Sequence, residues 1–194
     1  MITPITLHGW GVHLEPLSLA HADGLMAATT DGDLWKLHYT SVPEPTADSV
    51  AEYLRFALAG QARGDMLPFA VLDADGNLLG STRYYEIEPT TPTLAIGYTW
   101  YAARAQRTHV NSACKRLLLG HAFDELGMAT VYFHTSHENL RSQAAILRLG
   151  AKHDGVIRHH RRQKDGSLRD TFAYSIVKEE WPEIRDRLEL RLTR

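Results

Sequence analysis

The stretch TSHENLRSQAAILRLG, from Thr135 to Gly150, carries the most information about the fold of this chain. It runs from the end of an apolar strand into a short helix, with Asn139 and Ser142 three residues apart where the helix is predicted to begin. Asparagine is a preferred helix N-cap, and glycine after the last turn is a preferred C-cap. The predicted apolar face consists of Ala144, Ala145, Leu147 and Leu149. The stretch therefore predicts a strand and then a helix with a polar pair at its N-terminus.

The composition is that of an ordinary globular protein. Among 194 residues, 44% are hydrophobic, and 21 lysines and arginines nearly balance 23 aspartates and glutamates. This balance argues against a dedicated nucleic-acid binder, which usually carries a basic excess. Cys114 is the single cysteine, the N-terminus lacks the pattern of a signal peptide, and no apolar run approaches the length of a membrane span. We therefore expect a cytoplasmic protein that does not associate with a membrane.

Apolar periodicity, caps and turn residues predict the elements on either side of the opening stretch. Before it we expect a strand over 7–17, a helix over 18–29, and a helix that begins at Thr46 and ends near Gly60 to Gly64. We then expect strands over 67–72, 78–87 and 94–101, a helix over 110–126 and a strand over 129–135. After it we expect a hairpin of strands over 152–162 and 168–177 and a helix over 179–194. This order indicates one α/β domain that covers residues 1–194.

The segment from Leu94 to Gly155 resembles the GCN5-related N-acetyltransferase (GNAT) superfamily, and most closely its RimJ/RimL type, which acetylates protein N-termini. The motifs that carry the resemblance in this segment are IGYTWY (96–101), QRTHVNSACKRLLLGHAF (106–123) and HENLRSQAAILRLGA (137–151). Later in the chain RDTFAYSI (169–176) and EEW (179–181) also match, so the resemblance covers nearly the whole chain. The resemblance implies a mostly antiparallel, twisted α/β sheet with one splayed strand pair, flanked by helices. It also implies acetyl-CoA as co-substrate, an amine acceptor, no metal, and a homodimer as the family expectation.

The same resemblance assigns cofactor-binding residues. The pyrophosphate would lie on backbone N–H groups at the start of the helix that follows Gln106, where a helix dipole favours an anion. The pantetheine would lie along the end of the central strand, and Asn139 and Ser142 would contact the cofactor. In full, the implied binding residues are Thr99, Trp100, Tyr101, Gln106, Arg107, Thr108, His109, Val110, Asn111, Asn139 and Ser142. His109 and Asn111 occupy positions where the family has small residues. Their side chains are expected to limit how closely the cofactor can approach the backbone.

Ser142 is the predicted general acid for the leaving thiolate, because Ile146 stands where many relatives have a tyrosine. The alternative is that Asn139 is only a helix cap and Ser142 only a polar residue of the first turn. Ala95 replaces the glutamate that often serves as base, so Glu86 is the substitute candidate, with a solvated carboxylate as its alternative. At pH 7, deprotonation costs about 1 kcal/mol for an α-amine and about 4–5 kcal/mol for a lysine amine. A weak base therefore favours an α-amine acceptor.

Aromatic and basic residues outside these motifs allow more than one interpretation. Trp35, His38 and Tyr39 occupy the region where the family binds its acceptor, although packing explains them equally well. His134-x-x-His137 and His159-His160 lack further ligands at a metal-binding spacing, so we expect no metal site. The run RHHRRQK (158–164) is either a solvated strand or a contact for an acidic partner such as RNA or the cofactor 3′-phosphate.

The sequence thus predicts an acetyl-CoA-dependent N-acetyltransferase that acts on an amine, with the N-terminus of a protein, such as a ribosomal one, as one candidate acceptor. The competing hypothesis is a non-catalytic module of the same fold that binds CoA or a ribosome or RNA partner. His109, Asn111 and Ala95, which depart from the family pattern, keep this second hypothesis open.

Overall fold

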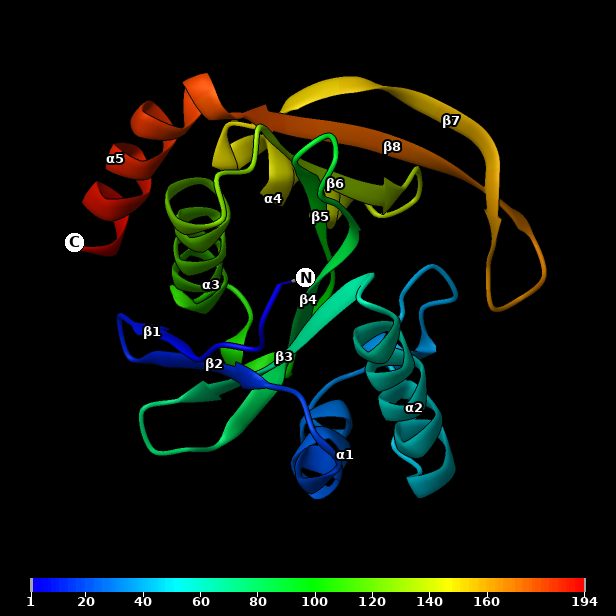
Figure 1. The fold of residues 1–194 in the computed structure, drawn as a ribbon. Helices are drawn as coiled ribbons and strands as arrows, with labels where there is room; N and C mark the ends of the chain where they lie inside the picture. The colour runs from blue at the N-terminus through cyan, green and yellow to red at the C-terminus, as the bar shows by residue number, and fades with distance from the viewer. Residues whose placement is uncertain (1, 194) are drawn as a thin grey trace.

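The computed structural model describes residues 2–193, and its strands form one eight-stranded sheet in the order β1-β2-β3-β4-β5-β6-β8-β7 (Figure 1). The strands are β1 Leu7–Gly9, β2 Val12–Pro16, β3 Met66–Asp73, β4 Leu78–Glu88, β5 Thr93–Tyr101, β6 Thr130–Ser136, β7 Lys152–Arg162 and β8 Leu168–Val177. Neighbouring strands are antiparallel except β5 and β6, which are parallel. The predicted mostly antiparallel α/β sheet is therefore confirmed.

Five α-helices cover the two faces of this sheet. They are α1 Ala22–Thr30, α2 Ala47–Arg63, α3 Val110–Gly120, α4 Leu140–Leu149 and α5 Trp181–Leu192. Helices α1 and α2 lie together on one face, and α3 and α5 lie together on the other (Figure 1). No helix in the described part of the chain is long and apolar enough to cross a membrane.

Side-chain caps and glycines end the helices at the positions that the sequence predicts. The Thr46 hydroxyl accepts the backbone N–H of Ser49 at the start of α2, and Asn139 Oδ1 accepts the backbone N–H of Ser142 at the start of α4. Gly150 follows α4 with a left-handed φ of 106°, a conformation that costs glycine little. Such local interactions explain why α2 and α4 could be bounded from the sequence alone.

Burial fastens α3 to the centre of the sheet. Tyr84 of β4 is fully buried, and its hydroxyl donates to the carbonyl oxygen of Leu118 at 2.7 Å. Phe69 of β3 packs edge-on against the Tyr84 ring. Fully burying side chains of this size stabilises the fold by about 1.5–3 kcal/mol each. The C-terminal half of α3 is thereby held against the middle of the sheet.

Three expectations about individual elements are wrong. The strand expected over 7–17 is a hairpin, because Trp10 and Gly11 both adopt left-handed φ angles and reverse the chain between β1 and β2. The helix expected over 110–126 changes to a π-helical turn over His121–Glu125. On α4 the buried residues are Ile146 and Leu149, whereas Leu147 is exposed, so the apolar face is rotated from the predicted one.

The sheet opens between β5 and β6. These parallel strands pair only over Thr93–Ala95 and Thr130–Tyr132, so the later backbone groups of β5 have no partner strand on that edge. On its other edge, β5 carries a bulge in which Tyr98 and Thr99 oppose Thr82 alone. Tyr98 has a left-handed φ of 51°. The splayed strand pair expected from the sequence is therefore present, and it leaves an unpaired strand edge at the centre of the fold.

Candidate active site

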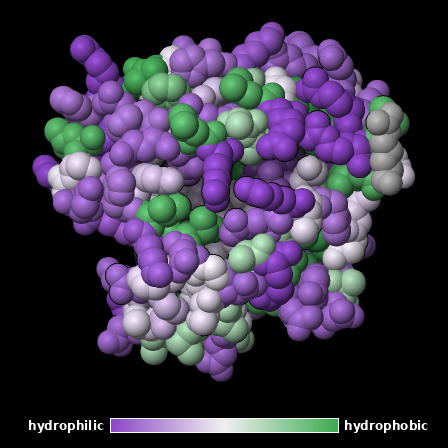
Figure 2. Space-filling model, turned by 180° about the vertical axis from the view of Figure 1, so that it is seen from behind, coloured by the Kyte–Doolittle hydropathy of each residue, from purple (hydrophilic) through white to green (hydrophobic). Residues whose placement is uncertain are grey.

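A cleft of about 1030 Å³ lies at the splay between β5 and β6. Its walls are the end of β5, the segment 105–112 at the start of α3, the first turns of α4, the loop 34–42 and the hairpin of β7 and β8. Figure 2 shows strongly hydrophilic side chains around a hollow in the middle of the face turned away from Figure 1. Segments far apart in the sequence thus enclose one space large enough for a cofactor and an acceptor.

The start of α3 forms one end of this cleft. Gln106, Arg107, Thr108 and Asn111 line it, together with the His109 side chain. The Nε2 atom of His109 lies 2.9 Å from the carbonyl oxygen of Trp10 in the β1–β2 turn, which draws the ring toward that turn. The first N–H groups of a helix have no intrahelical partner and attract an anion. Val110 differs from its neighbours because its side chain is buried, so only its backbone can serve a ligand.

The predicted β5 residues divide between the cleft and the core. Thr99 and Tyr101 line the cleft. Trp100 contributes to the cleft wall, but its side chain is 4% exposed and its ring nitrogen donates to the Tyr53 hydroxyl at 3.3 Å. The unpaired edge of β5 therefore offers backbone groups and the Thr99 side chain, whereas the Trp100 ring belongs to the core under α2.

Lys115 is a buried cation at the cleft that the sequence analysis did not single out. Its ammonium donates to the Thr99 hydroxyl at 3.1 Å, and Thr99 in turn lies 2.8 Å from the Thr82 hydroxyl. No carboxylate in residues 2–193 forms a salt bridge with it. Burial lowers the pKa of Lys115 to about 8. A positive charge thus lies against the β5 bulge without an anionic partner among residues 2–193.

Cys114 precedes this lysine and is fully buried. Burial raises the pKa of its thiol to about 11, so the thiolate required of a nucleophile is scarce at neutral pH. Cys114 is therefore a buried core residue.

The start of α4 brings Asn139 and Ser142 to the cleft. Asn139 Oδ1 is engaged by the Ser142 backbone N–H at 3.1 Å, so its cap role is realised. Among residues 2–193, the structure shows no hydrogen-bond partner for the amide nitrogen of Asn139 or the hydroxyl of Ser142. Ile146, one turn further, is buried and also lines the cleft, where it supplies an apolar wall in place of a proton donor.

A histidine on β6 provides the titratable group that best fits a base. His134 lines the cleft, and its Nδ1 lies 3.1 Å from the Tyr85 hydroxyl and 3.5 Å from a carboxylate oxygen of Glu86. Burial lowers the pKa of His134, and the Glu86 carboxylate acts in the opposite direction. The ring is therefore neutral at pH 7 and can accept a proton.

Glu86, the base candidate from the sequence, lies outside the cleft lining. Its carboxylate pairs with the Arg161 guanidinium at 3.0 Å and faces His134. In this geometry Glu86 orients and polarises His134 instead of reaching into the cleft.

The loop between α1 and α2 forms another part of the cleft wall. His38 and Tyr39 line the cleft, whereas Trp35 does not and packs partly buried against the core between α1, α2 and the sheet. The Lys164 ammonium donates to the carbonyl oxygens of Val42 at 2.8 Å and Trp35 at 3.3 Å, which ties the loop to the β7–β8 hairpin. Two of the three predicted aromatic residues thus meet the cleft.

The charge of the cleft contrasts with that of the chain. The formal net charge of the protein is −2. Among the described residues that line the cleft there is no aspartate or glutamate, but there are nine lysines and arginines: Arg107, Lys115, Arg141, Arg148, Arg161, Arg162, Lys164, Arg169 and Arg191. A cleft lined by one sign of charge concentrates ligands of the opposite sign.

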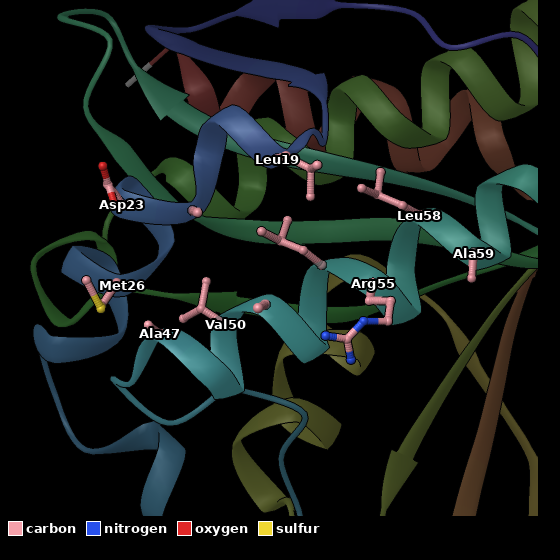
Figure 3. Close-up of a pocket in the computed structure, with 11 residues that line it drawn as sticks. Leu19, Asp23, Met26, Ala47, Val50, Arg55, Leu58 and Ala59 are labelled. Atoms are coloured by element: carbon pink, nitrogen blue, oxygen red, sulfur yellow. The ribbon is translucent and has the colours of Figure 1, made fainter.

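A second groove of about 610 Å³ lies between α1 and α2 and has a different chemistry (Figure 3). Its walls are aliphatic side chains such as Leu19, Val50 and Leu58, and Asp23 and Arg55 are its only charged residues. The described residues of its lining include no histidine, cysteine, serine or lysine. Within residues 2–193, no group of three or more metal-ligating side chains is present either.

The splayed strands, the helix start and the cationic cleft define an acyl-CoA-binding transferase. A family model described as the acetyltransferase (GNAT) domain matches residues 12–152. Because this match covers more than half of the chain, the protein belongs to the GNAT acetyltransferase family. The family resemblance seen in the sequence is therefore confirmed.

Individual relatives agree with this assignment. The chain is 29% identical over 107 residues to the "putative ribosomal N-acetyltransferase YdaF" of Bacillus subtilis (strain 168), a match that covers 55% of this chain and only 57% of that protein. A structure described as a "putative acetyltransferase" from T. thermophilus is 34% identical, with a TM-score of 0.88 and 99% of each chain covered. A GCN5-related N-acetyltransferase from Brucella melitensis is 28% identical, with a TM-score of 0.89, and the match covers 98% of this chain and 86% of that one.

Lys115, His134 and Arg161 were not predicted as site residues from the sequence. Their roles depend on contacts with residues that are distant in the chain. Lys115 had a local signal, because it follows Asn111 by four residues and so lies on the same helix face. His134 was considered only as a metal ligand, and Arg161 only as part of a basic run. Their cleft positions follow from the register of β6, β7 and β8.

Proposed function

We propose that the protein, as one acetyltransferase domain over residues 1–194, transfers the acetyl group of acetyl-CoA directly to an α-amine, either of a peptide N-terminus or of a small molecule. The single observation that carries the proposal is a cationic cleft at the β5–β6 splay, with the Ser142 hydroxyl and the neutral His134 imidazole on its walls. Acetyl-CoA supplies the thioester, and the protein residues bind it, orient it and move protons.

Cofactor binding is assigned to the α3 and β5 side of the cleft. The backbone N–H groups from Arg107 to Asn111 would hold the pyrophosphate, and Gln106 keeps the approach to this turn in place by donating to the Tyr101 carbonyl at 3.0 Å. The unpaired β5 edge would hold the pantetheine, with the Asn139 amide opposite. Lys115 would stabilise negative charge at Thr99, where the reacting end of the cofactor would lie.

The proton transfers are assigned to two side chains. His134 would take the proton from the acceptor amine as its nitrogen attacks the thioester carbonyl, and Glu86 and Tyr85 would hold the ring in place. As the carbon–sulfur bond breaks, Ser142 would donate a proton to the departing thiolate. The products are the acetylated amine and CoA, so no acyl group is attached to the protein.

An α-amine suits this site better than a lysine side chain. A histidine with a lowered pKa is a weak base, and an α-amine with a pKa near 8 needs only about 1 kcal/mol for deprotonation at pH 7. The name of the YdaF relative points to ribosomal substrates for that protein. For this chain a protein N-terminus is therefore the first acceptor to test.

The test measures cofactor binding and transfer separately. Isothermal titration should detect acetyl-CoA binding, and thiol release in the presence of amine-bearing peptides should detect transfer. Ser142→Ala should lower kcat by about 10²–10³-fold with little change in acetyl-CoA affinity, in keeping with the loss of a proton donor. Ser167→Ala, in the β7–β8 turn, serves as a matched control.

Two outcomes would contradict the proposal. Absence of acetyl-CoA binding at millimolar concentration would refute the cofactor assignment. Binding without thiol release for any amine would instead favour the non-catalytic module that binds CoA or another partner.

A further inference from the structure

The acceptor end of the cleft carries a pair of arginines that face each other across the β7–β8 hairpin. Arg161 and Arg169 are cross-strand partners, both line the cleft, and both are half-buried. Like charges placed directly opposite each other destabilise a sheet. The stability of the hairpin therefore does not explain why arginines occupy both positions.

The protein neutralises only one member of this pair. Arg161 donates to the Glu86 carboxylate at 3.0 Å. Within residues 2–193, no carboxylate lies within salt-bridge distance of Arg169, whose one side-chain hydrogen bond in the structure is to the neutral Thr171 hydroxyl at 3.1 Å. Burial, and then the charge of Arg161, lowers the pKa of Arg169. An arginine stays charged at any physiological pH, so a cation without an anionic partner lines the cleft.

The pair also lies close to the predicted position of the reaction. Arg161 donates to the Tyr98 hydroxyl at 3.3 Å, and Tyr98 precedes Thr99 in the β5 bulge. The Tyr98 ring packs edge-on against the Tyr85 ring at 5.2 Å between centroids, and the Tyr85 hydroxyl contacts His134. A group bound by the arginines is thus connected to the proposed base through two contacting aromatic side chains.

From this geometry we propose that Arg169, assisted by Arg161, forms a subsite for an oxyanion, either a carboxylate or a phosphate, that the acceptor carries next to its amine. The planar guanidinium matches both groups by paired, charge-assisted hydrogen bonds. The inference rests on the proposed acetyltransferase function and narrows its substrate class to acidic amines. The cations at the α3 end would serve the cofactor phosphates, which leaves the hairpin pair for the acceptor.

Matched acceptors test this subsite in the unmodified protein. Thiol release would be measured for Asp-Ala-amide against Asn-Ala-amide, and for phosphoserine-Ala-amide against Ser-Ala-amide, with saturating acetyl-CoA. The expected result is a kcat/KM at least tenfold higher for the anionic member of one pair, and that pair identifies the oxyanion as a carboxylate or a phosphate.

Variants of Arg169 then separate recognition from folding. Arg169→Gln should reduce the preference to about one, mainly by raising KM for the anionic acceptor, while the Kd of acetyl-CoA stays within twofold of the unmodified protein. Arg169→Lys keeps the charge and should retain part of the preference. Arg185→Gln, an arginine on α5 away from the cleft, is the control and should leave the preference unchanged.

The outcomes distinguish this inference from the function on which it rests. Equal rates within both pairs, or an Arg169→Gln variant that loses neutral and anionic acceptors equally, would overturn the oxyanion subsite while leaving acetyl transfer intact. If the protein transfers acetyl groups neither to these four acceptors nor to any other amine, the proposed function and the subsite are both overturned.

Discussion

Replacement of Lys115 by methionine is expected to make the unliganded protein more stable at neutral pH. The Lys115 side chain is 5% exposed, and burial lowers its pKa from 10.5 to about 8. Each unit of pKa is worth about 1.4 kcal/mol, so the charged lysine costs the folded state about 3 kcal/mol. Loss of the hydrogen bond to Thr99 offsets about 1 kcal/mol of the gain. At pH 7 the free energy of unfolding of the variant should therefore be about 2 kcal/mol higher than that of the unmodified protein.

The pH dependence of this difference identifies its cause. Below pH 8 Lys115 is charged in both the folded and the unfolded protein, so its cost is constant. Between pH 8 and 10.5 the unfolded chain binds more protons than the folded protein, and this contribution to stability rises with pH. The advantage of Lys115→Met should therefore be largest below pH 8 and shrink as the pH approaches 10.5.

Urea unfolding followed by circular dichroism, at several values between pH 7 and 9.5, measures this difference directly. Lys178→Met, which removes an exposed lysine, is the matched control and should show no such trend. Lys115→Met should also bind acetyl-CoA about tenfold more weakly, because a charge-assisted contact is lost. A variant that is less stable at pH 7, or a stability difference that does not change with pH, would refute the reasoning.

Three further predictions concern the N-cap of α4, the proposed base His134 and the close approach of β4 to β5. Asn139→Ala should lower the free energy of unfolding by about 1 kcal/mol in urea titrations, because the N-cap of α4 is lost. Glu86→Gln should extend activity to lower pH, because the carboxylate that raises the pKa of His134 is removed; an unchanged profile of kcat/KM against pH would contradict the role of His134. Gly80→Ala should destabilise the fold by about 2–3 kcal/mol on urea unfolding, since a Cβ there would collide with the Trp100 carbonyl oxygen.

Elements bounded by contacts within a few residues were predictable. The Thr46 cap, the Asp73–Asn77 turn and the glycine after α4 each depend on hydrogen bonds between neighbours in the chain. The rotation of the α4 apolar face was not predictable in this way, since Ala144 and Leu147 face solvent only because the sheet meets the helix at Ile146 and Leu149. Local chemistry decides where a helix begins and ends, and packing decides which side is buried.

By itself the sequence determined the class of the protein and most of its element order, and it predicted the residues of the proposed cofactor end of the cleft. That end is built largely from contiguous residues, Gln106 to Asn111, so its backbone groups can be located from one motif. Only the tertiary structure decided which groups meet in the part of the cleft where we propose that the acceptor binds and reacts. Glu86 reaches His134 across 48 residues of chain and Arg161 across 75, and strand register brings these groups together. Whether a side chain is charged, and whether it can act as a base, depends on its burial and its contacts, and a linear motif does not record these.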